Sequence, residues 1–494
     1  MKLGDSQMTA NILDTGIWDK KIFAGGWVDG HGGSQEVREP ATGDLLTTVG
    51  LGNASDIVIA AATAAVAQKQ WLAMPPRDKA AIFLKAARLM EEQADALGLW
   101  IARETGGLVL KGMHEVREAA TIFQLAAGLI TGPQGVTLAS PPGRLSLARR
   151  VPHGVVGVIS PFNFPLILSL RAVAPALAAG NGVVLKPDPQ TPVTGGFLIA
   201  RALELAGLPA GLLQVLPGGA EAGEALCTDP KVGMICFTGS TGVGRRVGEL
   251  AGRHLKKVAL ELGGKSPLIV LDDADIDLAV SNAAWGAFLH QGQICMASGR
   301  ILVHESMAPE FIRRLAGKAS HLPVGNPATE QVALGPLINA RQVQRVHGIV
   351  QDSIAAGAKL EAGGTYDGLF YKPTVLSNLK PGMRAFDEEV FGPVANIVTY
   401  RNDDEAVALA NTTEYGLSSA IISPSVGRAM ALGDRLGAGM LHINDQTVND
   451  ECTNPFGGRG CSGNGGRAGS IADLDEFTQW QWVTIKDTPP RYPF

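Results

Sequence analysis

Residues 155–186 read VVGVISPFNFPLILSLRAVAPALAAGNGVVLK, and this stretch decides the fold class. Two short apolar runs, 155–159 and 182–185, are typical of buried strands, and the run 166–177 between them carries apolar residues at helical spacing. A strand, a helix and a second strand in this order form the crossover unit that joins parallel strands. The stretch therefore predicts an α/β fold.

The same alternation continues to about residue 251. Helices are predicted over 195–206, 221–227 and 241–251, and strands over 213–216 and 234–237. Short apolar strands with helical crossovers predict a parallel, doubly wound sheet that binds ligands at the carboxyl ends of its strands. This is the architecture of a nucleotide-binding domain.

The pattern restarts after Glu261 and indicates a second α/β domain. Its predicted strands and helices are, in chain order, 267–271, 276–289, 301–303, 307–319 and 339–356. Upstream of the first domain's strands, the runs 60–70, 77–104 and 116–129 are predicted to be helices that cover the first sheet.

Two further segments, 145–151 and 478–485, alternate between apolar and polar residues. This period is typical of strands with one face open to solvent. We therefore expect both segments to be exposed strands outside the two main sheets.

The composition fits a chain of two or three domains whose partner is a small molecule. Its 494 residues correspond to two or three domains, and 62 glycines with 5% aromatic residues favour many strand-to-helix turns. A net charge of −5 without a basic stripe favours neither nucleic acid nor a membrane as partner. Neither a signal-peptide run nor a stretch of ~20 apolar residues is found, so we expect a cytoplasmic protein.

A thiol and a carboxylate supply the strongest chemical signal. Cys295 lies on the connection between a predicted helix and a predicted strand, and Glu261 lies where the second domain begins. A thiolate attacks carbonyl carbon and a nearby carboxylate activates water, so the pair suits covalent catalysis through a thioester. An isolated cysteine more often packs as a small apolar side chain, but a thiol on such a connection can face a cleft.

The other four cysteines give no such signal. Cys227 and Cys236 lie in apolar runs and are predicted to be core residues. Cys452 and Cys461 lie in a Gly/Asn-rich loop without the spacing of a zinc site, and an odd total of five cysteines fits a reducing compartment. The nine histidines show no HxxxH or HExxH spacing, so no metal is predicted.

A glycine-rich turn and a lysine indicate a dinucleotide. The turn at 237–244 follows a predicted strand and opens a predicted helix, which places free N–H groups and a helix dipole where a pyrophosphate can bind. Such turns also occur only because the backbone bends sharply there. Lys186 closes an earlier strand of the same sheet, where its amine can reach a ribose hydroxyl or a phosphate.

These motifs, taken together, resemble the aldehyde dehydrogenase superfamily from about residue 25 to the end of the chain. The matching segments are ISPFNFP at 159–165, KP at 186–187, FTGST at 237–241, ELGGK at 261–265, GQIC at 292–295, EVFGP at 389–393 and PFGG at 455–458. The resemblance implies two doubly wound α/β domains with a small β arm, in a homodimeric or homotetrameric enzyme. The implied division is a dinucleotide-binding domain at 1–136 and 153–260, a catalytic domain at 261–464, and an oligomerisation arm with the C-terminal segment at 137–152 and 465–494.

The resemblance also implies roles for single residues. Cys295 would be the nucleophile, Glu261 the general base, and Asn163 a donor to the oxyanion. The cofactor-binding residues would be Ser160, Pro161, Phe162, Lys186, Gly239, Ser240, Val243, Leu262, Glu389 and Phe391. Taken singly, Asn163 could instead be a turn residue, Glu389 a solvated charge, and Ser240 a helix N-cap.

Three positions depart from the family pattern. Pro189 replaces a glutamate that commonly binds the adenosine ribose, so NAD is the expected cofactor with NADP possible. Phe162 stands where a tryptophan is frequent. Ala468 replaces a glutamate proposed as an alternative proton acceptor, which leaves Glu261 as the main candidate base.

Within the superfamily, the chain resembles the aromatic aldehyde dehydrogenases that act on benzaldehyde or vanillin. This resemblance rests on the segments 284–293, 440–446, 186–191 and 492–494. The residues that would line the substrate tunnel are Phe164, Arg171, Ile294, Met296 and Phe456. Arg171 could bind a ring substituent or a carboxylate of the substrate, or could pair with an acid elsewhere in the chain.

Other functions stay open at this point. An aliphatic aldehyde or a semialdehyde is an alternative substrate within the same superfamily. A CoA-acylating enzyme would typically lack the Glu261 base, and a non-catalytic dinucleotide-binding relative would be expected to have lost Cys295 or Asn163.

Overall fold

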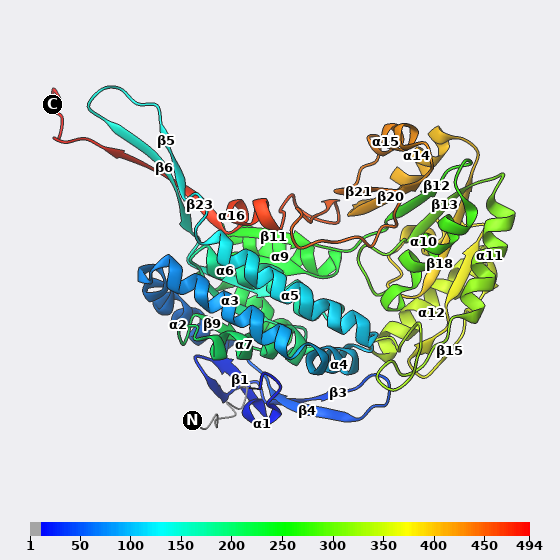
Figure 1. Ribbon diagram of the computed structural model, residues 1–494, viewed down its shortest axis with the longest axis horizontal. Helices are drawn as coiled ribbons and strands as arrows, with labels where there is room; N and C mark the ends of the chain where they lie inside the picture. Colours follow the sequence, from blue (N-terminus) through cyan, green and yellow to red (C-terminus); the bar gives the residue numbers. More distant parts are fainter. Residues whose placement is uncertain (1–10) are drawn as a thin grey trace, which may run out of the picture.

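The computed structural model describes residues 11–494, which form two α/β bodies and a projecting β arm (Figure 1). Residues 1–10, assigned from the sequence to the first domain, lie outside the described residues. The sheet of the first body has seven strands within the described part of the chain. In spatial order they are β11 (Lys257–Glu261), β10 (Val232–Thr238), β7 (Val155–Ile159), β8 (Gly182–Lys186), β9 (Leu213–Val215), β1 (Lys21–Ala24) and β2 (Trp27–Asp29).

Five of these strands, β11 to β9, are parallel, and β1 and β2 extend the sheet in antiparallel pairs. Alternate residues of β7 face opposite sides: Val156 and Val158 join one apolar core, whereas Val155 and Ile159 join another. Each core is closed by helices, so the sheet is covered on both faces, as parallel sheets require.

The helices divide between these two cores. One face is covered by α2 (Ala54–Ala73), α8 (Ala220–Thr228) and α9 (Thr241–Arg253). The other is covered by α3 (Pro76–Glu92), α4 (Ala94–Thr105), α5 (Val109–Leu129), α6 (Pro165–Ala178), the π-helical turn η1 (Val193–Phe197) and α7 (Leu198–Ala206). The doubly wound sheet predicted from residues 155–251 is therefore confirmed.

The second sheet also has seven strands within residues 11–494. In spatial order they are β14 (Lys359–Ala362), β17 (Thr374–Ser377), β18 (Val394–Tyr400), β13 (Arg300–His304), β12 (Pro267–Val270), β20 (Ser418–Ile422) and β21 (Met440–Ile443). All neighbouring pairs are parallel except β14 with β17. The helices α10 (Ile276–Phe288) and α11 (Ala308–His321) cover one face, and α12 (Ala340–Ala355), α13 (Arg384–Asp387), α14 (Asp403–Asn411) and α15 (Val426–Gly433) cover the other.

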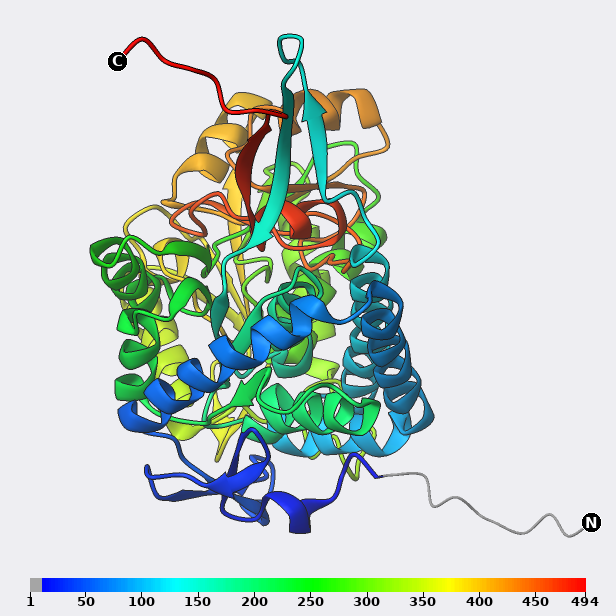
Figure 2. The ribbon, with the colours of Figure 1, turned by 90° about the vertical axis from the view of Figure 1, so that its left-hand side faces the viewer.

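The arm is a three-stranded antiparallel sheet that projects from the first body (Figures 1 and 2). Its central strand β6 (Leu145–Pro152) pairs with β5 (Gly135–Leu138) and with β23 (Thr478–Ile485). Both alternating segments predicted as exposed strands are thus strands, and they pair with each other along their whole length, from Leu145 with Ile485 to Pro152 with Thr478.

The remaining elements are short. They are α1 (Thr15–Trp18), β3 (Ser34–Arg38) paired with β4 (Leu45–Gly50), the turn η2 (Leu289–Gly292), β15 (Tyr366–Asp367) with β16 (Phe370–Tyr371), β19 (Tyr415–Gly416) with β22 (Arg459–Gly460), η3 (Ser470–Ala472) and α16 (Asp473–Glu476).

One local prediction was wrong, and one parallel strand of the first sheet was missed. The run 77–104, predicted as one helix, is broken at Gln93 into α3 and α4. The Gln93 side-chain oxygen accepts a hydrogen bond from the Ile12 N–H at 2.9 Å, a contact between distant segments that helical periodicity does not register. Strand β11 was missed because it lies at the sheet edge, where four of its five residues are only half-buried.

No single helix in residues 11–494 is long and apolar enough to cross a bilayer. Only α2 and α3 taken together have the required length and composition, and they are bent by 116° at the break between them.

Trp71 offers a test of the packing between α2 and α6. It is fully buried, and its Nε1 donates a hydrogen bond to the Leu177 carbonyl at 2.7 Å. We expect Trp71→Ala to lower the free energy of unfolding by about 3–5 kcal/mol because it leaves a large cavity. Val66→Ala on the same helix is the control, since Val66 is 63% exposed and its truncation should change stability by less than about 0.5 kcal/mol. Denaturant unfolding of both variants measures the difference, and equal losses would contradict this account.

Candidate active site

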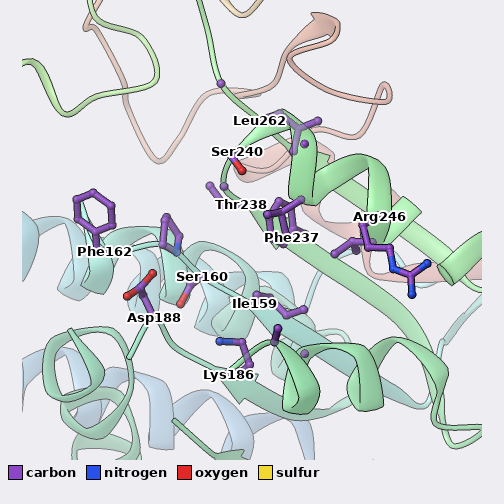
Figure 3. Close-up of a pocket in the computed structure, with 18 of the residues that line it drawn as sticks. Ile159, Ser160, Phe162, Lys186, Asp188, Phe237, Thr238, Ser240, Arg246 and Leu262 are labelled. Carbon is purple, nitrogen blue, oxygen red and sulfur yellow. The ribbon is translucent and has the colours of Figure 1, made fainter. Parts of the chain in front are cut away.

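A cleft of about 780 Å³ lies at the carboxyl ends of β7, β8 and β10, where a parallel sheet binds its ligands. Figure 3 shows Ser160, Lys186 and Asp188 on one side of this cleft and Ser240 and Leu262 on the other. Every residue predicted to be catalytic or to bind the cofactor lines it. These are Ser160, Pro161, Phe162, Asn163, Lys186, Gly239, Ser240, Val243, Glu261, Leu262, Cys295, Glu389 and Phe391.

Two glycines let three segments of chain meet in the cleft. A Cβ on Gly263 would overlap the Glu389 carboxylate, and a Cβ on Gly264 would overlap the Cys295 carbonyl oxygen. The segment after β11 therefore packs with bare backbone against both the thiol loop and the Glu389 loop. Glu261 ends β11 only two residues before Gly263, so this contact fixes the carboxylate relative to the thiol.

Cys295 follows a strained turn. His290 and Gln291 have φ of 47° and 56°, and Gly292 has φ of 64°, all in the left-handed region. A Cβ on Gly292 would also overlap the Gly392 carbonyl oxygen. The turn η2 is thus held against the 389–393 segment, and non-glycine residues at positive φ commonly mark functional sites.

Asn163 is held by a buried ion pair from α5. The Lys111 Nζ donates a hydrogen bond to the Asn163 carbonyl at 2.7 Å and pairs with Glu115. Glu115 in turn accepts hydrogen bonds from the N–H groups of Leu166 and Ile167 at the start of α6. The Asn163 side chain donates one N–H to the Gln293 carbonyl at 2.9 Å, which leaves its second amide hydrogen for a ligand.

Burial perturbs the charged groups at the cofactor end of the cleft. Glu389 accepts a hydrogen bond from the Gly264 N–H at 3.0 Å, and burial raises its pKa to about 7. Burial lowers the pKa of Lys186, an effect that the nearby Asp188 opposes. The Lys186 Nζ donates to the carbonyls of Gly218 at 2.9 Å and Pro187 at 3.3 Å, so its stem is fixed and its third hydrogen can bind a ligand oxygen.

The start of α9 fits a pyrophosphate. Ser240 is the N-cap residue but its side chain makes no capping hydrogen bond, so the first N–H groups of the helix keep their donors for a ligand. Gly242 and Gly219 face open space in the same cleft. The donors, the open backbone and the size of the cleft all fit a dinucleotide.

Burial raises the pKa of the Cys295 thiol above its ordinary value, and the nearby carboxylates Glu389 and Glu261 add to this effect. Burial also raises the pKa of Glu261 well above its usual range, against the opposing charges of Arg467 and Arg171. The thiol is therefore protonated at neutral pH until a positive charge or a base reaches it, and Glu261 is the stronger base for being buried.

The predicted substrate residues gather around the thiol. Ile294, Met296 and Phe456 form a buried apolar cluster, and Phe164 and Cys295 pack against it. The Lys111 amine lies over the Phe164 ring, 4.5 Å from the ring centre. This arrangement gives Cys295 an apolar neighbourhood on the side away from the dinucleotide cleft.

Arg171, for which two interpretations were open, pairs with an acid of the chain. Its Nη2 lies 2.7 Å from the Asp450 Oδ2, and its guanidinium stacks over the Phe456 ring at 4.7 Å. The Nε and Nη1 atoms are buried and have no hydrogen-bond partner within the described residues. Arg171 thus braces Phe456 and keeps two donors for a water or a ligand.

Three residues of this site were missed from the sequence: Lys111, Glu115 and Asp450. Lys111 and Glu115 stand four residues apart on the face of α5 that continues into Ala119 and Phe123. A charged pair on an apolar helical face is a readable signal for a buried ion pair. Asp450 has no comparable signal, because it lies in an irregular loop and meets Arg171 only through the fold.

Glu389 gives a pH-dependent prediction. A carboxyl whose pKa is raised on folding from 4.5 to about 7 binds more protons in the folded state than in the unfolded state across that window, so it lowers stability as pH rises from 4.5 to 7. Gln cannot ionise but can still accept the Gly264 hydrogen bond. We therefore expect the difference in melting temperature, Glu389→Gln minus the unaltered protein, to increase between pH 4.5 and 7. Above pH 7 this difference should be constant. A difference independent of pH would show that Glu389 titrates normally.

Comparisons with known proteins agree with this geometry. Residues 27–483 match the model of the aldehyde dehydrogenase family. The chain is 54% identical to a vanillin dehydrogenase of an Amycolatopsis species, over 98% of this chain and 100% of that protein. It is 50% identical to a benzaldehyde dehydrogenase [NAD(+)] of Pseudomonas putida, over 97% and 98%. The crystal structure of betaine aldehyde dehydrogenase from Staphylococcus aureus in complex with NAD+ superposes with a TM-score of 0.93 at 30% identity, covering 96% of each chain.

Proposed function

We propose that this chain, which belongs to the aldehyde dehydrogenase family, oxidises an aromatic aldehyde to the carboxylic acid with NAD as cofactor. The observation that carries the proposal is the cleft in which Cys295, Glu261 and Asn163 meet a dinucleotide-sized space at the carboxyl ends of the first sheet. The vanillin and benzaldehyde dehydrogenases to which the chain is similar over its full length support the aromatic substrate.

In the proposed first step, Cys295 loses its thiol proton to water, and the thiolate attacks the aldehyde carbon to form a thiohemiacetal whose oxygen carries negative charge. The free amide hydrogen of Asn163 and the Cys295 N–H stabilise that charge as it develops. The ion pair of Lys111 and Glu115 contributes by fixing the Asn163 backbone, so the donor need not reorganise during the reaction.

A bound oxidised nicotinamide supplies a positive charge near the thiol and accepts the hydride. The thioester that remains on Cys295 is released by water. Glu261 takes one proton from this water, the new C–O bond forms, and the C–S bond breaks to release the Cys295 thiolate and the carboxylic acid. Its raised pKa suits Glu261 to this task, because the carboxylate binds a proton readily.

The apolar cluster beside Cys295 suits an aromatic ring. Phe164 and Phe456 offer ring faces on which a flat substrate can stack, and Ile294 and Met296 flank the thiol between them. The Arg171 guanidinium behind Phe456 holds that ring in place.

NAD rather than NADP is the proposed cofactor because of Asp188. This acid follows β8, lines the cleft and lies close to Lys186 (Figure 3). An acid near a strand's carboxyl end accepts a hydrogen bond from a ribose hydroxyl and repels a 2′-phosphate. Asp188 thereby compensates for Pro189 at the next position.

The proposed domain division and assembly follow the two sheets and the arm. The dinucleotide-binding domain comprises 1–136 and 153–260, the catalytic domain 261–464, and the arm with the C-terminal segment 137–152 and 465–494. Large apolar side chains exposed on the arm support assembly of two or four copies through it. They include Val136, Trp480, Trp482 and Ile485.

Reduced-nicotinamide absorbance tests the activity directly. The assay compares benzaldehyde, vanillin and a short aliphatic aldehyde, each with NAD and with NADP. We expect kcat/KM to be at least roughly tenfold higher for the aromatic aldehydes and for NAD. Cys295→Ala should abolish turnover, whereas Cys461→Ala, which removes another partly exposed thiol, should retain it. Preference for the aliphatic aldehyde would keep the chemistry but overturn the substrate class.

Glu261→Gln separates the two half-reactions. The variant keeps the thiol and its oxyanion donors, so mixing it with aldehyde and NAD should give a burst of NADH close to one per active site. Steady turnover should then fall by roughly 10² or more, because the thioester loses its general base. Stopped-flow absorbance resolves the two phases. A variant that turns over at the full rate would remove Glu261 from the base role.

A further inference from the structure

A second cavity, which we call the rear chamber, adjoins Glu261. Its volume is about 40 Å³, and its walls include Arg171, Ala172, Thr238, Glu261, Arg467 and Glu476. These residues come from α6, β10, β11, α16 and the loop before η3. Glu261 lines both the rear chamber and the main cleft, so its carboxylate stands between the two spaces.

The rear chamber has the size and the polarity to hold water. A cavity needs roughly 10–15 Å³ to admit one water molecule, and that water needs two to four polar partners. Three buried atoms of lining residues have no hydrogen-bond partner within the described part of the chain: Glu261 Oε2, Arg171 Nε and Arg171 Nη1. Buried polar atoms are rarely left unsatisfied, so we expect two or three waters among them.

Glu476 lines the chamber and is also partly exposed to solvent. Its side chain is 13% exposed, and its Oε1 lies 3.4 Å from the Nζ of Lys257, which is 33% exposed. Glu476 belongs to α16, which lies at the root of the arm (Figure 1). A partly exposed carboxylate that lines the chamber can contact both water inside it and the bulk solvent.

A general base in this site needs a route by which its proton can reach bulk solvent. Each deacylation transfers one proton from water to Glu261, and the carboxyl must lose that proton before the next turnover. A bound dinucleotide and the acyl group would occupy the main cleft during deacylation and leave it little room for water other than the one that reacts. Burial holds the proton on Glu261, since it raises the pKa of that carboxyl well above its usual range.

We propose that water in the rear chamber carries the proton from Glu261 to Glu476, which releases it to solvent, and that Glu476 is the proton-relay residue of this enzyme. The proposal rests on the proposed role of Glu261 as the base. At each step one O–H bond breaks as the next forms: from the Glu261 carboxyl to a chamber water, from water to the Glu476 carboxylate, and from Glu476 to bulk water. No electrons are transferred, and Glu261 returns to its ionised form.

The charges around Glu261 are consistent with a proton that moves outward. Arg171 of α6 and Arg467 favour its ionised form, Glu476 of α16 opposes it, and Cys295 faces it across the cleft. Cys236 of β10 also faces the chamber, and burial raises the pKa of its thiol, so it stays neutral. The two arginines therefore stabilise Glu261 once its proton has left.

The test measures acylation and deacylation by an ester in place of an aldehyde, with saturating NAD present so that the dinucleotide occupies the main cleft as it does during turnover. p-Nitrophenyl acetate acylates a reactive thiol, releases nitrophenolate in a burst, and leaves an acetyl thioester that only hydrolysis can remove. Glu476→Gln keeps the size of the side chain but cannot carry a proton. Asp475→Asn, at the adjacent exposed acid, is the matched control. Ala172→Leu is a second variant, which fills the chamber with an apolar side chain and leaves every charged group in place.

We expect Glu476→Gln and Ala172→Leu to keep the burst rate, to lower steady turnover by roughly tenfold or more, and to accumulate acetyl-enzyme detectable by intact mass. The pH profile of deacylation should shift in Glu476→Gln and should be unchanged in Asp475→Asn. Wild-type deacylation in both chamber variants, or an equal loss of burst and turnover, would overturn the proposal. If the unaltered enzyme hydrolyses the ester through Cys295 but oxidises no aldehyde, the proposed substrate is wrong and the relay is still tested. If the unaltered enzyme shows no burst, both the assignment of Cys295 as the nucleophile and the relay are wrong.

Discussion

The site depends on the close backbone approach at Gly263 and Gly264. Glu261 ends the edge strand of the first sheet, whereas Cys295 precedes a central strand of the second, so the two reacting groups belong to different bodies. Their separation is set by how those bodies pack, and the chain segments meet closely where Gly264 approaches the Cys295 carbonyl and Gly263 approaches the Glu389 carboxylate. A side chain at Gly264 would push the thiol loop away from Glu261, and one at Gly263 would displace the Glu389 carboxylate. Preorganised geometry of this kind is what catalysis by proximity requires.

The buried charges of the site divide into two kinds. Lys111 with Glu115, and Arg171 with Asp450, are paired with each other and hold backbone or aromatic groups in place. Glu261 and Glu389 form no ion pair with a basic side chain within residues 11–494, and burial raises the pKa of both. Paired charges are fixed in one protonation state, whereas an unpaired buried carboxyl is poised to bind a proton or a ligand. The pairing pattern therefore separates the residues that position the site from those that can react in it.

Local pattern was enough to predict most of the first sheet and its crossovers. The strands β7, β8 and β10 are fully or mostly buried runs, and α6 and α9 carry helical spacing, so each could be recognised alone. Strands β1, β2 and β11 could not, because they are short and only partly buried, and β2 and β11 lie at the two edges of the sheet, where a strand pairs on one side alone. The family resemblance, confirmed by the match over residues 27–483, placed the site residues that periodicity cannot place. The pairing of Lys111 with Glu115 could have been read from their spacing, but its contact with Asn163 and that of Asp450 with Arg171 could not, since these partners are 52 and 279 residues away in sequence.

The root of the arm shows how an exposed element can coexist with a fixed site. Asn181 is fully buried, and its side chain accepts a hydrogen bond from the Gly154 N–H and donates to the carbonyls of Ala176 and Phe477. Phe477 directly follows Glu476, so this amide also anchors the end of α16 that carries Glu476 to the rear chamber. The arm strand β23 is mostly exposed beyond Thr478, but the chain at its root is tied to the first body through a satisfied buried amide. The position of Glu476 thus depends on the packing of the first sheet and is independent of what the arm contacts.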